Sequence, residues 1–466
     1  MQRSAILFVL LCFSLTVAAQ SIDETHKRIQ DLAAERNYSA AAAELAKLKA
    51  AQPIIFEANN YDYLAARMSE KSGDTAAALA YYQSVIKRDS ILREYALWHV
   101  SRIARASGNL LLERIRLEEL LAYSPDSLFA GAARQELAES WFAGGDVARS
   151  AALFEQQIST AKNSAGQANS QSSRKNIAML ADAKLTLGET AKARELYARL
   201  IAETLNPGQA DDYALAGALG LDRLDAAGAG RHELSDYEHL QRASIYQFNR
   251  DFKNAQTHYE AILTKYPESG IAPDAIFQIG RGFAQRGDYV EAVQWFERVL
   301  ERYPDHPVAK DALLQAASSY ARVAKEREAV SRYRRYIELY PDDPRVDRAY
   351  LNIVDILRDH REESEAIKWA NEAKAVFRGK LPEALAQFAE ARIYLSRGDW
   401  EKALDGLEKL KNLSELGGPS VPGGTTLAEV TFLRGFVLES LRRFPEAIDA
   451  YLSIPDGRNE YYGWRA

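Results

Sequence analysis

The sequence contains almost no cysteine. Its single cysteine, Cys12, lies in an apolar stretch near the amino terminus, so the rest of the chain can form neither a disulfide nor a thiolate metal site. The alternating runs of Val, Ile and Thr that predict strands are also missing. Lys and Arg (59) do not outnumber Asp and Glu (65), and the net charge of −6 argues against the concentrated basic face that nucleic acid requires. These absences favour a helical protein stabilised by its core alone, with no nucleic-acid partner.

Motifs that carry chemistry are absent as well. The seven histidines are scattered, and no His-Glu-x-x-His pattern is present to hold zinc. His232 and His239 lie one heptad apart, and we expect exposed or capping histidines there. Ser159 and Lys162 match the Ser-x-x-Lys of penicillin-binding enzymes, but the companion Lys-Thr-Gly and Ser-Asp-Asn motifs are missing. We therefore expect no catalytic residue, no cofactor and no metal site.

The first 19 residues have the pattern of a secretory signal peptide. Arg3 precedes an apolar run from Ala5 to Val17, and small residues follow up to Ala19. The run is short against the ~20 residues that span a bilayer, so cleavage near Ala19 is favoured over an uncleaved anchor helix. Leu11, directly before Cys12, disfavours lipidation. The sequence thus predicts an exported protein, periplasmic or secreted, with no transmembrane segment after cleavage.

A sequence motif, here called the phrase, recurs every 37 residues in the second half of the chain. Its clearest copy is Gly287-Asp288-Tyr289, followed by Ala292 and Phe296, and the other first positions are Arg250, Ala324, Arg361 and Gly398. A Tyr-Pro pair that ends three successive units, at 266–267, 303–304 and 340–341, keeps the same step. A fixed period of this length is the signature of a solenoid.

Looser copies of the phrase fill the first half and the end of the chain, and they begin at Arg36, Gly73, Gly108, Gly145, Gly188 and Arg442. They bring the total to about eleven helix pairs. We divide the chain into a degenerate array at 20–205, an extra helix and junction at 206–232, a regular array at 233–412, a Gly/Pro loop at 413–426 and a terminal pair with the start of a further helix at 427–466. A polar stretch at 159–176 is expected to be a loop or a frayed helix end.

Each residue of the phrase has a physical reason. Gly287 can adopt the left-handed conformation that ends a helix, and Asp288 can cap the next helix. Ala292 is small where two helix backbones approach, and Pro307 starts a helix without needing a donor. The residues that we expect to maintain the repeat in this way are Gly73, Gly145, Gly188, Gly287, Ala292, Phe296, Ala329, Tyr333, Gly398 and Ala403.

The phrase resembles the tetratricopeptide (TPR) family over roughly residues 30–455, in a longer variety with Tyr-Pro at the end of the second helix. The resemblance implies an all-α, right-handed solenoid whose concave face binds peptides or partner proteins. Similar exported arrays serve cell-envelope assembly and maintenance. The resemblance therefore implies a periplasmic or secreted scaffold that binds a protein or peptide partner and is not an enzyme.

The carboxyl-terminal segment is also similar to the helical superhelix of soluble lytic transglycosylases. This similarity rests on Phe444-Pro445-Glu446-Ala447-Ile448, Tyr451 and Tyr461-Tyr462-Gly463. It implies, as the alternative function, the peptidoglycan-binding portion of such an enzyme, with a catalytic domain beyond Ala466. The catalytic Glu-Ser and Gly-Leu-Met-Gln pattern of those enzymes is not found in a suitable context here.

One cluster of side chains is a candidate partner-binding patch, because Arg and Tyr are frequent in binding hot spots. It consists of Arg327, Arg332, Arg334, Arg335 and Tyr336. The alternative is that the arginines are merely solvated, while the neighbouring Tyr333 and Tyr340 pack between helices. The sequence alone leaves both interpretations open.

Overall fold

A computed structural model describes residues 21–162, 171–204, 206, 208–228, 233–455 and 461–465. The predicted signal peptide with Cys12 lies outside these residues, and so does His232. The described residues form 25 helices and no β-strand, and one isolated bridge joins Gly417 and Thr425. Among them, no helix is both long and apolar enough to cross a membrane. The predicted all-α class is confirmed.

The contact pattern divides the chain into two compact units, and the first contains residues 1–206 and 211–232. Its helices are α2 (Ser21–Ala34), α3 (Tyr38–Ala51), α4 (Pro53–Ala58), α5 (Tyr61–Ser72), α6 (Thr75–Lys87), α7 (Arg93–Ala106), α8 (Leu110–Tyr123), α9 (Ala130–Ala143), α10 (Val147–Lys162), α11 (Gln171–Thr186), α12 (Thr190–Ala202) and α13 (Asp212–Ala226). Five antiparallel pairs result, from α2·α3 to α11·α12, and α4 is a short addition to the first of them. The extra helix α13 packs against α12 and α11.

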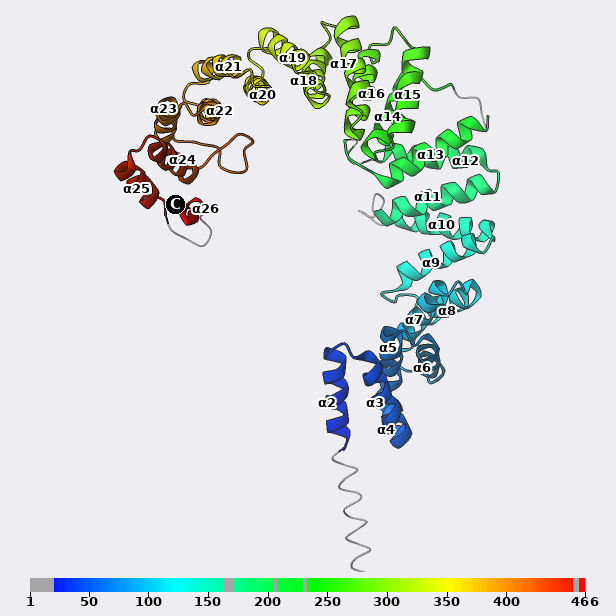
Figure 1. Ribbon diagram of the computed structural model, residues 1–466. Helices are drawn as coiled ribbons and strands as arrows, with labels where there is room; N and C mark the ends of the chain where they lie inside the picture. Colours follow the sequence, from blue (N-terminus) through cyan, green and yellow to red (C-terminus); the bar gives the residue numbers. More distant parts are fainter. Residues whose placement is uncertain are drawn as a thin grey trace, which may run out of the picture. The chain divides into compact units, whose positions relative to one another are not determined.

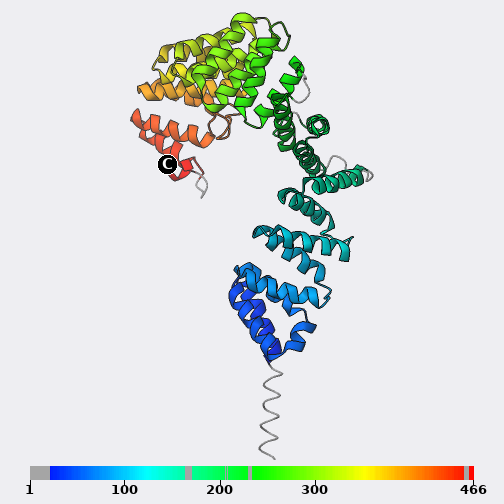
Figure 2. The ribbon, with the colours of Figure 1, turned by 90° about the vertical axis from the view of Figure 1, so that its right-hand side faces the viewer.

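The second unit contains residues 207–210 and 233–466. Its helices are α14 (Asp236–Phe248), α15 (Phe252–Lys265), α16 (Ala272–Arg286), α17 (Tyr289–Arg302), α18 (Pro307–Arg322), α19 (Glu326–Leu339), α20 (Val346–Asp359), α21 (Glu363–Val376), α22 (Leu381–Arg397), α23 (Trp400–Lys411), α24 (Leu427–Ser440), α25 (Phe444–Leu452) and α26 (Tyr461–Arg465). They form six pairs, α14·α15 to α24·α25, so the predicted number of about eleven pairs is confirmed. Within this unit the pairs follow an arc, with the first helix of each pair on its inner side and the second on its outer side (Figure 1), and Figure 2 shows the helices of this unit from the side, packed next to one another.

The backbone repeats with the period of the sequence. The first position of every copy of the phrase, here named the turn position, has a left-handed φ between 55° and 89°. Six of these residues are glycines (73, 108, 145, 188, 287 and 398), and five are Arg36, Arg250, Ala324, Arg361 and Arg442. The turn position therefore connects the two helices of a pair in all eleven copies, whether or not glycine occupies it.

Substitutions at two turn positions should change stability in opposite directions. Gly287→Ala should destabilise the protein by about 1 kcal/mol, because a residue with a Cβ is strained at a φ of +89°. The added Cβ itself would meet no atom within 4 Å, so no steric clash adds to this cost. Ala324→Gly should be neutral or stabilising by up to ~1 kcal/mol, since it relieves the same strain at φ 55°. Urea unfolding of both variants tests this pair, and destabilisation by Ala324→Gly would contradict the shared role.

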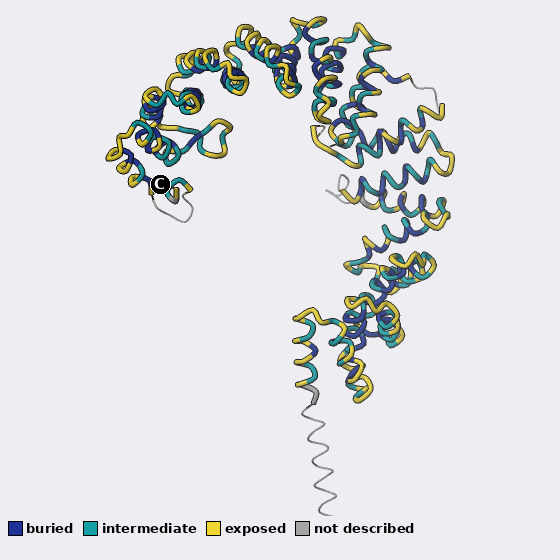
Figure 3. The backbone as a smooth tube through the Cα atoms, in the orientation of Figure 1, coloured by how far each residue is buried: buried dark blue, intermediate teal, exposed yellow. Residues whose placement is uncertain are grey.

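The core of each pair is built from two complementary positions. The residue five after the turn position is at most 3% exposed in all eleven pairs and is Ala in nine of them. The exceptions are Glu113 and Ser150. The residue seven positions before the turn position packs against the residue nine positions after it, and in ten of the eleven pairs one of the two is Gly, Ala or Ser, the exception being Ile29 with Leu45. In the α16·α17 pair these two residues are Gly280 and Phe296, whereas in the α20·α21 pair they are Val354 and Ala370. Figure 3 shows the buried residues along the faces where helices meet within each unit.

Two local expectations are wrong, and a third is tested only in part. Asp288 is the N-cap of α17 but makes no side-chain capping bond, because its carboxylate pairs with Arg286 at 2.9 Å. Of the stretch 159–176, expected to be a loop or a frayed helix end, the part up to Lys162 belongs to α10 and the part from Gln171 to α11, and residues 163–170 lie outside the described residues. His239 is buried, and its Nδ1 lies 2.9 Å from Nδ1 of His258.

Candidate functional site

The predicted arginine-tyrosine cluster lies on α19, a second helix on the outer side of unit 2 (Figure 1). Arg332 donates two bonds of 2.8 Å to Glu297, and Arg334 pairs with Glu338 at 2.9 Å. The inclusion of Tyr336 is wrong, because its side chain is fully buried and its ring packs against Tyr340. Arg327 and Arg335 remain exposed. The five residues therefore do not form one continuous patch.

The inner side of unit 2 presents a more regular surface. On each first helix, four positions lie 13, 9, 6 and 2 residues before the turn position. Their spacing places them on one face of the helix, so they form one stripe along it. All of them from α14 to α22 are exposed or half-buried except Leu385. The stripe residues are Tyr237, Gln241, Ser244 and Phe248 on α14; Asp274, Gln278, Arg281 and Gln285 on α16; Asp311, Gln315, Ser318 and Arg322 on α18; Arg348, Asn352, Asp355 and Asp359 on α20; and Leu385, Ala389, Arg392 and Ser396 on α22.

One position of this stripe carries a side-chain amide in four successive helices. Gln241, Gln278, Gln315 and Asn352 follow one another at steps of 37 residues, and we name them the amide row. The sequence analysis missed this row, although its signal was present as four amides in the repeat register. The arrangement places one group that both donates and accepts hydrogen bonds on each of four neighbouring first helices.

The side-chain amides of the row form only some of their possible hydrogen bonds within the protein. The side-chain oxygen of Gln278 accepts bonds of 3.2 Å from Gln247 and Arg281, which leaves the NH₂ group of Gln278 to donate. Asn352 donates to the Tyr333 hydroxyl at 3.0 Å, which leaves the Asn352 carbonyl to accept. Gln241 and Gln315 are exposed. Each member thus retains hydrogen-bonding capacity toward the inner side.

The Gly/Pro loop at 413–426 ends the amide row. The loop is held by its own turn bonds, Gly418 N–H to the Thr425 carbonyl at 3.0 Å and Thr425 N–H to the Leu416 carbonyl at 2.9 Å. It extends over the inner side of unit 2 (Figure 1), where Arg348 of α20 donates to the Pro422 carbonyl at 3.3 Å. There Gly417 approaches Leu385, and the next member of the row would be Ala389. The accessible row therefore runs from α14 to α20.

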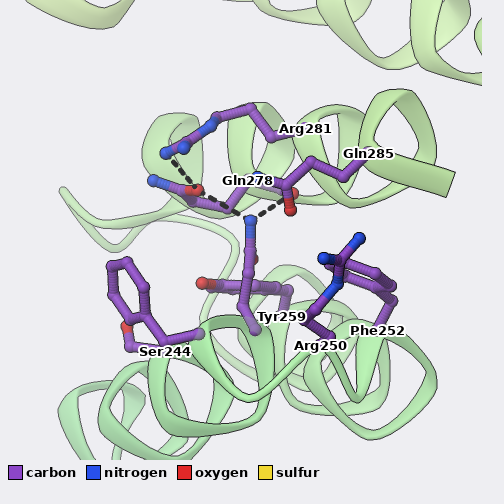
Figure 4. A pocket seen from close by; sticks show the side chains of 9 residues that line it. Ser244, Arg250, Phe252, Tyr259, Gln278, Arg281 and Gln285 are labelled. Carbon is purple, nitrogen blue, oxygen red and sulfur yellow. Dashed lines mark hydrogen bonds between the residues drawn. The ribbon is translucent and has the colours of Figure 1, made fainter. Parts of the chain in front are cut away.

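A cavity of about 280 Å³ opens at the other end of the row, between α14, α15 and α16. Ser244, Gln278, Arg281 and Gln285 contribute to it from the stripe (Figure 4). Tyr259 of α15 forms part of its wall, and burial raises the pKa of Tyr259 to about 12, so its hydroxyl keeps its proton at neutral pH. Burial also raises the pKa of Asp274, which lies nearer the start of α16. Among the described residues, no group of three or more His, Cys, Asp or Glu is placed to hold a metal ion.

Comparison with known proteins agrees with this geometry. Residues 240–307 match the tetratricopeptide repeat family, and residues 284–416 match the family described as "Tetratricopeptide repeat protein 21 ARM repeat". Together these two matches cover residues 240–416, the segment that carries the amide row. No curated protein matches the chain at a significant level.

Solved TPR structures are similar at low identity. The C-terminal part of a TPR repeat-containing protein from Cytophaga hutchinsonii is 15% identical, with 63% of this chain and 100% of that chain covered and a TM-score of 0.35. A TPR protein from Parabacteroides merdae is 14% identical, with 72% and 94% covered and a TM-score of 0.24. YrrB, whose structure is described as that of a TPR protein with an unusual peptide-binding site, is 17% identical, with 42% and 91% covered and a TM-score of 0.31.

Proposed function

We propose that this chain is an interaction scaffold that binds an extended segment of a partner protein along the inner side of unit 2, from α14 to α20. The amide row supports this proposal. An extended peptide has backbone N–H and C=O groups without internal partners, and each side-chain amide can both donate to and accept from such groups. Because the row recurs once per repeat, it would hold a segment by its backbone and leave the other stripe residues to select side chains.

The location of this scaffold is a second part of the proposal. The apolar run from Ala5 to Val17 and the small residues up to Ala19 support export, with a role in the cell envelope. Amino-terminal sequencing of the protein purified from the cell envelope or the medium tests it. A mature chain that begins at Gln20 is the expected result, and retention of Met1 together with a cytoplasmic location would contradict export.

Replacing the amide row should abolish most of the binding. We expect peptides selected from a random 12-residue display library to bind the mature protein, and the variant with Gln241, Gln278, Gln315 and Asn352 all changed to Ala to bind them about 100-fold more weakly. The reason is that each lost hydrogen bond contributes about 0.5–1.5 kcal/mol and 1.4 kcal/mol is tenfold in affinity. Fluorescence anisotropy with the labelled peptides measures the dissociation constants.

A matched control removes amides from the outer helices. The variant Gln256→Ala, Gln294→Ala, Asn371→Ala should retain affinity within about twofold, because these residues lie on α15, α17 and α21. Equal weakening by both variants, or no selected peptide at all, would contradict binding along the inner side. If the wild type and the amide-row variant co-sediment equally with purified peptidoglycan, the result would argue against a protein partner.

A further inference from the structure

The cavity beside Gln278 lies next to a departure from the repeat register. Five residues before the turn position, the other four repeats of the regular array carry Ile245, Ser319, Ile356 and Ile393, whereas α16 has Gly282. A second, much narrower space beside the cavity reaches Gly282, where an added Cβ would find its nearest neighbour, Phe252, at 3.7 Å. The missing side chain at this position leaves this narrow space open next to the cavity.

The walls of the cavity near the inner side are rich in hydrogen-bond donors. Arg281 and Gln278 of α16 lie on one wall, and Ser244 of α14 and Tyr259 of α15 lie on the opposite one (Figure 4). Arg281 holds the Gln278 oxygen at 3.2 Å, which turns the Gln278 amide so that its NH₂ group is the part left to bind a ligand. The Tyr259 hydroxyl is protonated at neutral pH, and burial raises its pKa further, to about 12.

The charge of Arg281 is not balanced within the described part of the chain. Its one side-chain hydrogen bond is to the neutral Gln278, and no described acidic side chain forms an ion pair with it. Asp274, the acidic stripe residue of the same helix, lies two turns earlier. By contrast, Arg332 and Arg345 of the same unit are each paired with a carboxylate. A half-buried guanidinium without a carboxylate partner is suited to an anionic ligand, and Arg250 adds a second cation to the cavity wall.

We propose that this cavity binds a carboxylate group of the partner segment, with Arg281 as its cation and Gln278, Tyr259 and Ser244 as additional donors. The inference rests on the proposed function, because the segment held by the amide row would deliver the carboxylate. A carboxylate only accepts hydrogen bonds and offers two oxygens to the planar fork of arginine, so it matches the donors on these walls. Either an Asp or Glu side chain or the carboxyl terminus of the partner can supply this group.

Three small probes distinguish these sources without requiring a peptide. N-acetylglutamate α-amide carries only a side-chain carboxylate, its isomer N-acetylglutamine carries only a main-chain carboxylate, and N-acetylglutamine amide carries none. In isothermal titration calorimetry with the full mature chain, we expect at least one of the two acids to bind about tenfold or more tightly than the neutral diamide. Arg281→Gln should remove this preference, and Arg281→Lys should restore part of it.

Two further variants test the position of the site. Ser244→Phe should block the probes, since it places a ring in the cavity at a register position that holds Phe436 in α24. Arg335→Gln, which removes an exposed charge from the outer helix α19, should leave binding of the probes unchanged. Equal binding of all three probes, or a preference for acids that survives Arg281→Gln, would overturn the proposal.

The result for the cavity is separable from the result for the amide row. Changing Gln241, Gln315 and Asn352 to Ala leaves every residue of the cavity wall in place, so this variant should lose peptide binding and keep the acid probes. If the wild type selects no peptide but still prefers an acid probe, the proposed function fails and the carboxylate site stands. If peptides bind but neither acid probe is preferred, the carboxylate site fails alone.

Discussion

Replacing Arg105 with Met should destabilise unit 1 by about 3 kcal/mol. Arg105 of α7 donates to Glu113 at 2.6 Å, and the Glu113 side chain is fully buried. The substitution keeps most of the side-chain volume but leaves a carboxylate in the core without its cation, and breaking a buried pair from one side typically costs about 3–5 kcal/mol. We expect the lower end of this range because Arg105 is 36% exposed and the Ser140 hydroxyl still donates to Glu113 at 2.8 Å.

The effect should be local and should depend on the charge of Glu113. Hydrogen exchange measured by mass spectrometry on native protein reports the opening of α7 to α9 directly, which suits a repeat array whose units unfold in part. Adding Glu113→Gln to Arg105→Met should recover about 2 kcal/mol, because a neutral amide needs no cation. The control Lys192→Met, which removes an exposed pair with Glu195, should stay within about 0.5 kcal/mol. A loss below 1 kcal/mol for Arg105→Met would show that water reaches Glu113.

Glu113 also marks where reasoning from the sequence reaches its limit. The turn positions, the pairs and the alanine five residues later follow from local rules that each repeat obeys, so the fold could be predicted from the period alone. Glu113 occupies that alanine position in one pair only. Its burial depends on Arg105 and on Ser140 from the next pair. Such a three-helix contact leaves no periodic trace in the sequence.

The candidate site was predictable only in part for a related reason. The amide row obeys the 37-residue step and could have been read from the sequence as a surface feature. The arginine cluster was chosen by residue type, and the structure instead buries Tyr336 and pairs Arg332 with Glu297 of the preceding repeat. The cavity is lined by side chains of α14, α15 and α16, so it appears only once these three helices are packed.

The pairing of sizes inside each repeat leads to the second large effect. A Cβ added to Gly280 would lie 2.8 Å from the ring of Phe296, which is itself fully buried. We therefore expect Gly280→Val to destabilise unit 2 by about 3 kcal/mol through overpacking. The control Gly282→Ala, two residues along the same helix, should be neutral or slightly stabilising, because its Cβ has room and alanine favours the helix.

The repeat at α20 and α21 shows how the loss should be recovered. There Val354 and Ala370 occupy the positions of Gly280 and Phe296, so the larger residue has moved from the second helix to the first. Phe296→Ala alone should cost about 3–5 kcal/mol through the cavity it leaves. The double variant Gly280→Val, Phe296→Ala should be more stable than the sum of the single changes predicts by about 2 kcal/mol, since the valine fills that cavity. Urea unfolding of the four proteins gives this coupling energy, and simple additivity would mean that the two positions do not share one space.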